Sequence, residues 1–375
     1  MKIFSDRNIL AVEDRFSCHG ELRLFDGRVV ERSDLMDADV LLVRSITTVD
    51  EQLIGGSSIR FVGTATSGID HIDTDYLNAA GIGFAHAKGS NANAVVEYCF
   101  SALAYAVVHH GFRLQHSKVG IIGVGAVGAL FAARLRELGV EVHCCDPLLA
   151  EEYPERDYCS LNEALDCDVV SVHVPLTRDI PTATLGMIGA KELGRLGDGA
   201  VFINACRGLV VDESALEQVL AKRSDLVTVF DVWADEPAIN TKLANSVTIA
   251  TPHIAGYSVQ AKLNATDILV RAFEEFFNLQ APPEVNAESV DIEPMLLGFE
   301  TKAQREWLTL LEAFSIGQLS DQFKAEMDAG ATAQAFDSFR KKLLSRCEWS
   351  ANWLERDNYS DSQQKFLSSL GFRFV

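Results

Sequence analysis

The chain has 375 residues, of which 48% are hydrophobic, and a formal net charge of −20. This length predicts two or three domains with substantial apolar cores. The strong negative charge argues against nucleic acid or an anionic membrane surface as a partner. The eight cysteines are scattered, with neither a C-x-x-C pair nor the spacing of zinc ligands, so we predict reduced core thiols and no metal site.

Two features of the sequence bear on location. The beginning of the chain, MKIFSDRN, lacks the apolar core of a secretory signal. The longest apolar stretch, over 95–108, is interrupted by Glu97 and is short for a bilayer span, which predicts a buried helix. We therefore expect no membrane contact and a cytoplasmic protein.

Residues 1–95 alternate short apolar runs with helical segments, which is typical of a small parallel α/β domain. The loops after its strands contain Arg44, Ser45 and the segment 64–68, and such loops bind ligands in open sheets. The expected strands are 2–5, 40–43 and 60–63, and the expected helices are 50–54, 73–80 (capped by Asp73 or Thr74) and the long helix 91–110.

The segment 118–146 contains a glycine fingerprint. An apolar strand is followed by Gly123, Gly125 and Gly128 in G-x-G-x-x-G spacing, then by a helix and a second strand that ends at Asp146. The first glycine allows a tight turn, the second allows close approach to a diphosphate, and the third allows helix to pack on strand. Asp146 has the spacing of the acid that binds an adenosine ribose, and its charge repels a 2′-phosphate. The segment predicts a Rossmann-type site for NAD rather than NADP.

After Asp146 the alternation continues and completes a doubly wound sheet near Ala255. A helix over 263–277 is expected to return to the first domain, which would then be split in sequence. The pair Pro282-Pro283 marks a boundary, and short amphipathic helices follow it. The expected strands of this part are 168–174, 200–204, 226–230 and 247–249, and the expected helices are 191–196 and 213–221.

These elements predict three domains. A substrate-binding domain covers 1–95 and is completed by 256–282. A Rossmann-type NAD-binding domain with a doubly wound parallel sheet covers 96–255. A C-terminal domain covers 286–375.

Three loops that follow strands place Arg207, Glu236 and His253 at one edge of the sheet. An imidazole can take the hydroxyl proton when a hydride leaves a carbinol carbon. A neighbouring carboxylate orients the ring and favours its protonated form, and an arginine binds a carboxylate in a bidentate manner. Downstream of a dinucleotide fingerprint, these residues predict oxidation of a hydroxy acid. His173 is interpreted as a structural or cofactor-lining residue, and the pair Cys144-Cys145 as core thiols.

The sequence resembles the D-isomer-specific 2-hydroxyacid dehydrogenases over residues 1 to about 280. The resemblance rests on the fingerprint, NACRGLVVDESAL (204–216), DVWADEP (231–237) and TPHIAG (251–256). It implies a flavodoxin-like split substrate domain and NAD-dependent oxidation of a small phosphorylated 2-hydroxy acid. The stretch 336–350 resembles in part an extra C-terminal α+β dimerisation domain, which implies a homodimer.

The resemblance also implies a role for each matching residue. Arg207 and Glu236 match the active-site arginine and glutamate, and His253 matches the proton donor. Many relatives have a larger polar residue in place of Ala126, but the contact expected there is through the backbone. The implied cofactor-binding residues are Gly123, Gly125, Ala126, Val127, Gly128, Asp146, Val174, Asp231 and Gly256, and the implied substrate-binding residues are Ser45, Thr66 and Tyr257.

The expected substrate has two anionic groups, a carboxylate and a distal phosphate, and each needs residues that bind it. Arg207 with the backbone N–H groups near Ser67-Gly68 is expected to hold the carboxylate, and Arg44 with Ser45 the distal phosphate. Two alternatives stay open. The substrate could be another 2-hydroxy acid, such as glycerate or 3-phosphoglycerate, or the chain could be an NAD-sensing scaffold or corepressor on the same fold.

Overall fold

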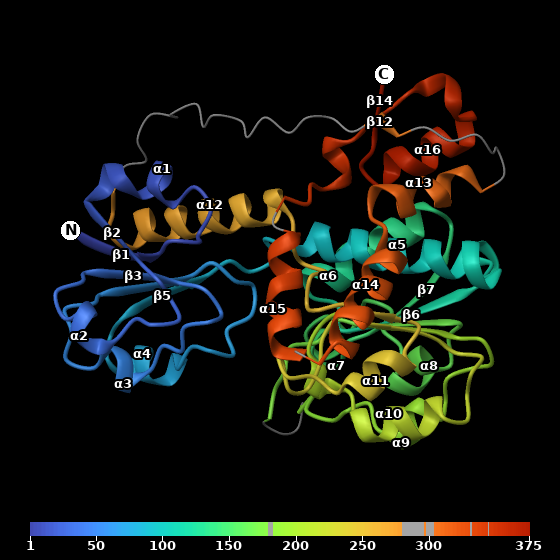
Figure 1. Cartoon of the computed structure of the whole chain (residues 1–375), viewed down its shortest axis with the longest axis horizontal. Coiled ribbons are helices and arrows are strands. Elements are labelled where there is room, and N and C mark those ends of the chain that lie inside the picture. The colour runs from blue at the N-terminus through green and yellow to red at the C-terminus, as the bar shows by residue number, and fades with distance from the viewer. Residues whose placement is uncertain (179–182, 280–295, 298–303, 331, 344) are drawn as a thin grey trace. The chain divides into compact units, whose positions relative to one another are not determined.

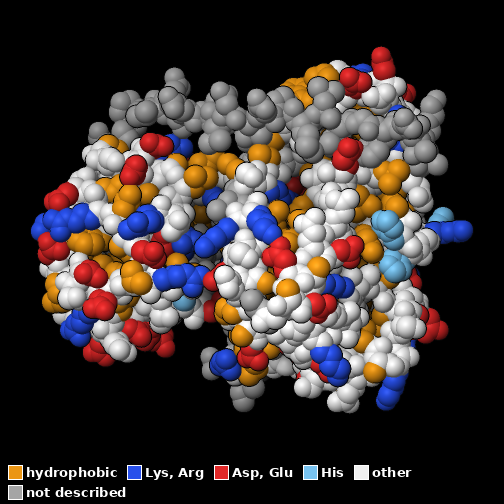
Figure 2. Space-filling model, in the orientation of Figure 1, with side chains coloured by type: hydrophobic (Ala, Val, Ile, Leu, Met, Phe, Trp, Pro, Cys, Tyr) orange, Lys and Arg blue, Asp and Glu red, His pale blue; other side chains and the backbone are white. Residues whose placement is uncertain are grey.

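The computed structural model describes residues 1–178, 183–279, 296–297, 304–330, 332–343 and 345–375 (Figure 1). The chain forms two compact units. The first contains Met1–Asn91 and the segment that begins at Val259, and the second contains Ala92–Ser258 and the described C-terminal segment. The predicted boundary at Pro282-Pro283 lies outside the described residues. Acidic and basic side chains are interspersed over the visible face of each unit (Figure 2).

The first unit is built on a five-stranded parallel sheet of order β2-β1-β3-β4-β5, which is the flavodoxin-like order. Its strands are β1 (Lys2–Asp6), β2 (Glu21–Phe25), β3 (Val40–Val43), β4 (Phe61–Thr64) and β5 (Gly83–His86). The sequence predicted β1, β3 and β4, whose residues are almost all buried. It missed β2 and β5, because these two edge strands are only partly buried and lack a continuous apolar run.

Five of the described helices accompany this sheet: α1 (Val12–Phe16), α2 (Arg32–Leu35), α3 (Glu51–Ile54), α4 (Thr74–Ala79) and α12 (Val259–Phe276). Asp73 caps α4 by accepting a hydrogen bond from the Tyr76 N–H. The helix α12 packs on α1, β4 and β5, with the Phe273 ring edge-on to Phe16 at 5.4 Å and to Phe61 at 6.1 Å. The returning helix predicted over 263–277 is therefore present and completes the first unit.

The second unit contains a six-stranded parallel sheet of order β11-β10-β9-β8-β6-β7. The chain passes from β7 across β6 to β8, so the strand order reverses between β6 and β8, where doubly wound sheets bind ligands. The strands are β6 (Lys118–Ile122), β7 (Glu141–Cys145), β8 (Val169–Val172), β9 (Val201–Asn204), β10 (Val227–Phe230) and β11 (Ile249–Ala250). The helices are α5 (Ala92–His110), α6 (Ala126–Glu137), α7 (Pro147–Glu152), α8 (Leu161–Leu165), α9 (Ala190–Leu193), α10 (Glu213–Leu220) and α11 (Thr241–Ser246).

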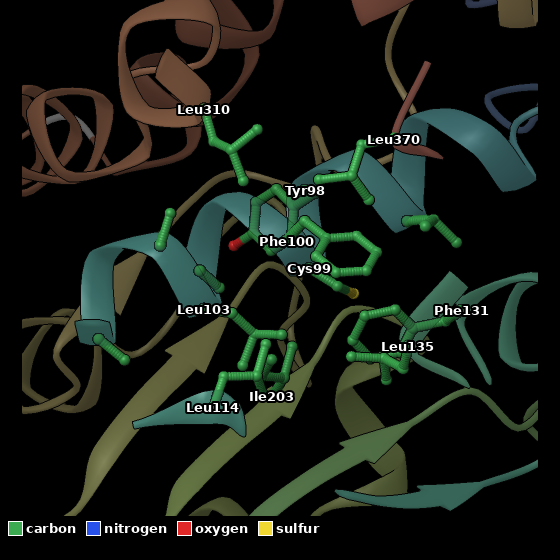
Figure 3. Packing of buried hydrophobic residues seen from close by; sticks show 14 of the residues in the cluster. Tyr98, Cys99, Phe100, Leu103, Leu114, Phe131, Leu135, Ile203, Leu310 and Leu370 are labelled. Atoms are coloured by element: carbon green, nitrogen blue, oxygen red, sulfur yellow. The ribbon is translucent and has the colours of Figure 1, made fainter. Parts of the chain in front are cut away.

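The long helix α5 lies in the middle of the core of this unit. Phe100 and Leu103 point toward α6 and the sheet, where Phe131 meets Phe100 edge-on at 5.2 Å (Figure 3). Leu310 and Leu370 of the C-terminal segment cover another side of the helix (Figure 3). Because it is covered on several sides, α5 is apolar nearly all round, as predicted for a buried helix. None of the described helices is long and apolar enough to cross a membrane.

The described C-terminal segment packs on the second unit. Its helices are α13 (Arg305–Ala313), α14 (Ile316–Asp328), α15 (Thr332–Lys342) and α16 (Asp361–Ser369), and β12 (Leu296–Leu297), β13 (Trp353–Leu354) and β14 (Arg373–Phe374) form a small parallel sheet. The helix α14 runs along β11, where the Ala250 N–H donates to Ser320 Oγ and the Lys324 ammonium donates to the carbonyls of Val247 and Thr248. The segment thus covers one edge of the six-stranded sheet. The described residues also form short 3-10 helices: η1 (Ser17–His19), η2 (Leu114–His116), η3 (Gly208–Val210), η4 (Trp349–Ala351) and η5 (Arg356–Asn358).

Candidate active site

The three fingerprint glycines have distinct surroundings. Gly123 has a φ of 88°, and a Cβ added to it would lie 2.7 Å from the carbonyl oxygen of His173. A Cβ on Gly128 would lie 2.0 Å from the carbonyl oxygen of Gly123, so only glycine lets α6 approach the turn this closely. A Cβ on Gly125 would meet no atom within 4 Å. Of the three glycines, Gly125 is therefore the one that faces open space.

The open space at Gly125 adjoins the N-terminus of α6. The backbone N–H groups of Ala126, Val127 and Gly128 belong to the first turn of this helix and have no acceptor within it. Ala126 is exposed and Val127 is half-buried. Such N–H groups and the positive end of the helix dipole favour a diphosphate. The residues present therefore fit the diphosphate of NAD.

Asp146 directly follows β7 and forms hydrogen bonds with two neighbouring segments. One carboxylate oxygen accepts the N–H of Val124 at 2.9 Å, and the other accepts the N–H of Leu149 at 3.2 Å and caps α7. A carboxylate can accept about four hydrogen bonds in all. Half-buried Asp146 therefore has acceptor capacity left for the hydroxyls of a ribose.

Val174 follows β8 and lies against the glycine turn, because its Cγ1 would be 2.8 Å from a Cβ on Gly123. Beside it, the His173 ring forms a hydrogen bond with Ser171 Oγ at 2.9 Å. Desolvation lowers the pKa of His173 to about 4, so the ring is neutral at physiological pH. These contacts are compatible with the interpretation of His173 as a structural or cofactor-lining residue.

The loop after β11 holds His253 in a left-handed conformation with a φ of 55°. Its backbone N–H donates to the Asp231 carbonyl at 2.6 Å, and its ring Nδ1 lies 2.7 Å from Glu236 Oε2. The other oxygen of Glu236 accepts the N–H of Trp233 at 2.9 Å. The His253 side chain is 36% exposed, which leaves the imidazole accessible.

Glu236 is ionised near neutral pH. Burial alone would raise its pKa, but the charge of His253, the hydrogen bond from His253, the N–H of Trp233 and the nearby Arg340 together hold the pKa below its ordinary value. An ionised Glu236 accepts the Nδ1–H of the imidazole and leaves Nε2 as the proton-accepting atom. The pair can therefore take a proton from a hydroxyl group.

Asp231 is completely buried beneath the same loop. One of its oxygens accepts the Thr251 hydroxyl at 2.7 Å and the Ile254 N–H at 2.8 Å, and the other accepts the Ala255 N–H at 2.8 Å. The Thr251 hydroxyl also contacts the Tyr98 hydroxyl at 2.7 Å. Asp231 thus anchors the loop that carries His253, and its implied role in cofactor binding stays a prediction.

Arg207 lies just after β9, next to the loops of Glu236 and His253. The three residues follow β9, β10 and β11, which are neighbours in the sheet. A Cβ on Gly208 would lie 1.9 Å from the carbonyl carbon of Trp233, so this glycine brings the loops after β9 and β10 together. Half-buried Arg207 donates from Nη1 to the Cys206 carbonyl at 2.7 Å. The structure thus joins Glu236 to His253 directly and holds Arg207 at the adjacent strand end.

The first unit contains the predicted substrate residues Ser45 and Thr66, after the neighbouring strands β3 and β4. Ser45 is exposed. The Thr66 hydroxyl donates to the Gly68 carbonyl at 2.9 Å and contacts the Thr64 hydroxyl at 2.8 Å, and that hydroxyl in turn contacts His71 Nε2 at 2.9 Å. Thr66 is thereby fixed in one orientation.

Sequence reasoning missed two basic residues, Lys262 in the first unit and Arg340 in the second. Burial and repulsion by Arg44 lower the pKa of Lys262 to about 8, so two cations share this part of the first unit. Arg44 also forms an ion pair with buried Asp6 at 3.1 Å. In the second unit, the Arg340 guanidinium lies 5.2 Å from the Tyr257 ring. Neither Lys262 nor Arg340 lies in a local sequence motif. Only the tertiary fold brings α12, which contains Lys262, close to Arg44, and α15, which contains Arg340, close to Tyr257.

Gly256, between Ala255 and Tyr257, follows the anchored part of the loop and is half-buried. Among the described residues, no group of three His, Cys, Asp or Glu side chains could hold a metal ion. All eight cysteines are free. Cys144, Cys145 and three others are buried, in agreement with core thiols, but the prediction is wrong for exposed Cys18, and Cys159 and Cys347 are only partly buried.

Known proteins are similar to this chain in both sequence and fold. Residues 102–255 match the family model described as D-isomer specific 2-hydroxyacid dehydrogenase, NAD binding domain. Over its full length the chain is 40% identical to erythronate-4-phosphate dehydrogenases of Escherichia coli O81 (strain ED1a) and Escherichia coli O7:K1 (strain IAI39 / ExPEC), and 99% of each relative is covered.

Solved structures give the same fold. D-lactate dehydrogenase from Aquifex aeolicus, complexed with NAD and lactic acid, has a TM-score of 0.62 and 25% identity, and the match covers 74% of this chain and 96% of that chain. NAD-bound 3-phosphoglycerate dehydrogenase from Entamoeba histolytica has a TM-score of 0.64 and 24% identity, with 74% and 95% covered.

The chain therefore belongs to the D-isomer specific 2-hydroxyacid dehydrogenase family, as its motifs predicted. Its full-length relatives in this family are the erythronate-4-phosphate dehydrogenases, which match 100% of the chain. The predicted NAD cofactor and dehydrogenase class are confirmed by the match to the NAD-binding domain of this family and by the full-length relatives. The α/β class with a Rossmann-like sheet is confirmed as well.

Proposed function

We propose that the chain oxidises 4-phospho-D-erythronate at C2 to 2-oxo-3-hydroxy-4-phosphobutanoate, a step in the synthesis of pyridoxal 5′-phosphate. The observation that carries this proposal is the 2.7 Å contact between His253 and Glu236, one strand away from Arg207 and in the same unit as the glycine turn. Similarity over the full length of erythronate-4-phosphate dehydrogenases supports the choice of substrate.

The proposed chemistry assigns one task to each residue. NAD, when bound, supplies the acceptor for the hydride that leaves C2. His253 takes the hydroxyl proton on Nε2 as the carbonyl group forms, and ionised Glu236 stabilises the resulting imidazolium through Nδ1. Arg207 binds the carboxylate beside C2 and keeps the carbinol carbon in place. In the reverse reduction His253 returns the proton.

Further residues are assigned to the remaining substrate groups. Ser45, Thr66 and Tyr257 contact the substrate, and the backbone near Ser67-Gly68 assists Arg207 with the carboxylate. Arg44 with Ser45 binds the distal phosphate, and the cation of Lys262 near Arg44 supports an anion there. The cofactor contacts are those of the glycine turn and of Asp146, Val174, Asp231 and Gly256.

A steady-state assay with NAD and three acids tests this function. We expect kcat/KM to be highest for 4-phospho-D-erythronate, and at least tenfold lower for 3-phosphoglycerate and for glycerate. The same assay on the His253→Ala variant provides the background rate. Preferred turnover of either other acid would reassign the substrate, and NADH binding without turnover of any acid would favour the NAD-sensing scaffold.

We further propose that residues 286–375 join two copies of the chain into a homodimer in the cytoplasm. Sedimentation of the full-length protein at micromolar concentration tests this arrangement. A monomer under these conditions would contradict it.

A further inference from the structure

Arg346 of the C-terminal segment is buried behind the loop that carries His253. Its side chain is only 6% exposed. One guanidinium nitrogen, Nη1, donates to the carbonyls of Ala255 at 3.2 Å and Tyr257 at 2.9 Å. These two carbonyls flank Gly256, so a single side chain holds both ends of this short turn.

The other face of the Arg346 guanidinium is bound to helix α5. Nη2 donates to the Ala94 carbonyl at 3.3 Å and to Glu97 Oε2 at 3.0 Å. The Phe314 ring stacks against the guanidinium, with its centre 3.9 Å from the Arg346 Cζ. The arginine therefore bridges the His253 loop to the most deeply buried helix of the unit.

Glu348 makes a second bridge two residues further along. It is 5% exposed, and its two oxygens accept the Ser258 hydroxyl at 2.7 Å and the Asn93 amide at 2.6 Å. Ser258 is the last residue of the loop before α12 begins. Arg346 and Glu348 thus fasten the loop from Ala255 to Ser258 to the first turns of α5.

Buried Glu97 connects helix α5 to the C-terminal segment through further hydrogen bonds. It is 1% exposed, and its Oε1 accepts the Trp349 N–H at 2.8 Å and the Asn93 amide at 3.1 Å. Burial raises the pKa of Glu97 to about 8, and the positive charge of Arg346 acts against this rise. Without Arg346, the buried Oε2 of Glu97 would lose the hydrogen bond that Nη2 donates to it, and an unsatisfied buried polar group is unfavourable.

The His253 loop is therefore held from two sides. Asp231 binds the N–H groups of Ile254 and Ala255, and Arg346 binds the carbonyls of Ala255 and Tyr257. A misplacement of a catalytic group by about 1 Å can cost about 10²-fold in rate, even when the cause is remote. We infer that Arg346 and Glu348 are positioning residues for His253, so that each chain needs its own C-terminal segment for turnover. This inference rests on the proposed function.

The test compares Arg346→Ala with Lys341→Ala in the full-length protein. Lys341 is exposed in the same segment, and its removal changes the net charge equally. For Arg346→Ala we expect kcat to fall at least tenfold while the affinity for NADH changes less than threefold. For Lys341→Ala we expect both quantities to stay within twofold of the parent. Added guanidinium ion should restore part of the kcat of Arg346→Ala and none of that of His253→Ala.

Two outcomes for Arg346→Ala overturn the inference. One is a parental kcat in the folded variant. The other is a loss of kcat that guanidinium ion does not reverse in a variant with full NADH binding. A loss of kcat matched by an equal loss of NADH-binding sites means only that the variant has not folded. If Arg346→Ala does not fold, Glu348→Gln replaces it, with an expected threefold or larger fall in kcat, and a parental kcat there also overturns the inference.

Hydrogen exchange separates this inference from the proposed function. If the parent protein turns over none of the tested acids, the proposed function fails. The positioning can still be measured as amide exchange at Ile254 and Ala255, whose N–H groups bind Asp231. Exchange at these amides should accelerate in Arg346→Ala and not in Lys341→Ala. Equal exchange in the two variants would mean that Arg346 does not hold the loop.

Discussion

The glycine turn and the His253 loop belong to the same unit but are built in different ways. The turn is local, since Asp146 and Val124, which tie its two strands together, are 22 residues apart. The loop is assembled from distant side chains, since Tyr98 is 153 residues from Thr251 and Arg346 is 91 residues from Ala255. The proposed diphosphate site therefore depends on backbone groups and glycines, whereas the position of His253, the proposed catalytic group, depends on buried polar contacts over long range.

The largest expected effect separates chemistry from cofactor binding. His253→Ala should lower kcat by at least about 10²-fold, the contribution typical of a general acid–base, and leave NADH binding intact. The matched control is His143→Ala, because His143 is also paired with a carboxylate, Glu141, at 2.8 Å. NADH fluorescence and steady-state rates measure both quantities. An unchanged kcat in His253→Ala would end its assignment as the proton carrier.

Substitutions in the glycine turn should weaken NADH binding, which His253→Ala should leave intact. In Gly128→Ala the added Cβ overlaps the Gly123 carbonyl, so we expect a loss of about 1–3 kcal/mol in the free energy of unfolding together with weaker NADH binding. In Gly125→Ala the Cβ enters open space, so NADH binding should weaken with a stability change of only about 1 kcal/mol or less. Denaturant unfolding and NADH titration measure the pair. Equal stability losses in the two variants would contradict this view of the turn.

A smaller effect is expected at Asp146. Asp146→Ala removes the carboxylate that repels a 2′-phosphate, so the preference for NAD over NADP should fall by about tenfold. The ratio of kcat/KM for the two cofactors measures this preference. Asp50→Ala is the control, since Asp50 caps α3 through the Leu53 N–H in the same way but lies in the other unit. The ribose contact would be wrong if both variants kept the parental ratio.

The smallest effect concerns stability at low pH. The pKa of Glu236 is held below its ordinary value in the folded chain, so its ionised form stabilises the fold above about pH 4.5. This contribution is lost as the pH falls through the lower pKa of the folded state. The difference in melting temperature between the parent and Glu236→Gln should therefore shrink below pH 4.5. A difference that stays constant down to pH 3 would show that the ionisation of Glu236 does not stabilise the fold.

The parts of the fold that could be predicted are those encoded locally. Runs of apolar residues predicted β3 and β9, and the glycine spacing predicted the turn after β6. The edge strands β2 and β5 were missed because their residues are half-exposed and follow no clear pattern.

In the candidate site, too, the features with a local sequence pattern could be predicted, and those that depend on distant residues could not. The sequence placed Arg207, Glu236 and His253 at the ends of three strands, and these strands are adjacent. It could not reveal that Asp231 is buried beneath the loop, or that Arg346 reaches the loop from the C-terminal segment. Both facts depend on tertiary contacts between residues that share no local motif.

The contact between α14 and β11 has a consequence for self-association. The outermost strand of a sheet displays unpaired N–H and carbonyl groups, to which another chain can add a strand. Ser320 and Lys324 occupy such groups at Val247, Thr248 and Ala250. A chain shortened before α14 would lose this cover, and its open strand would become a template for aggregation.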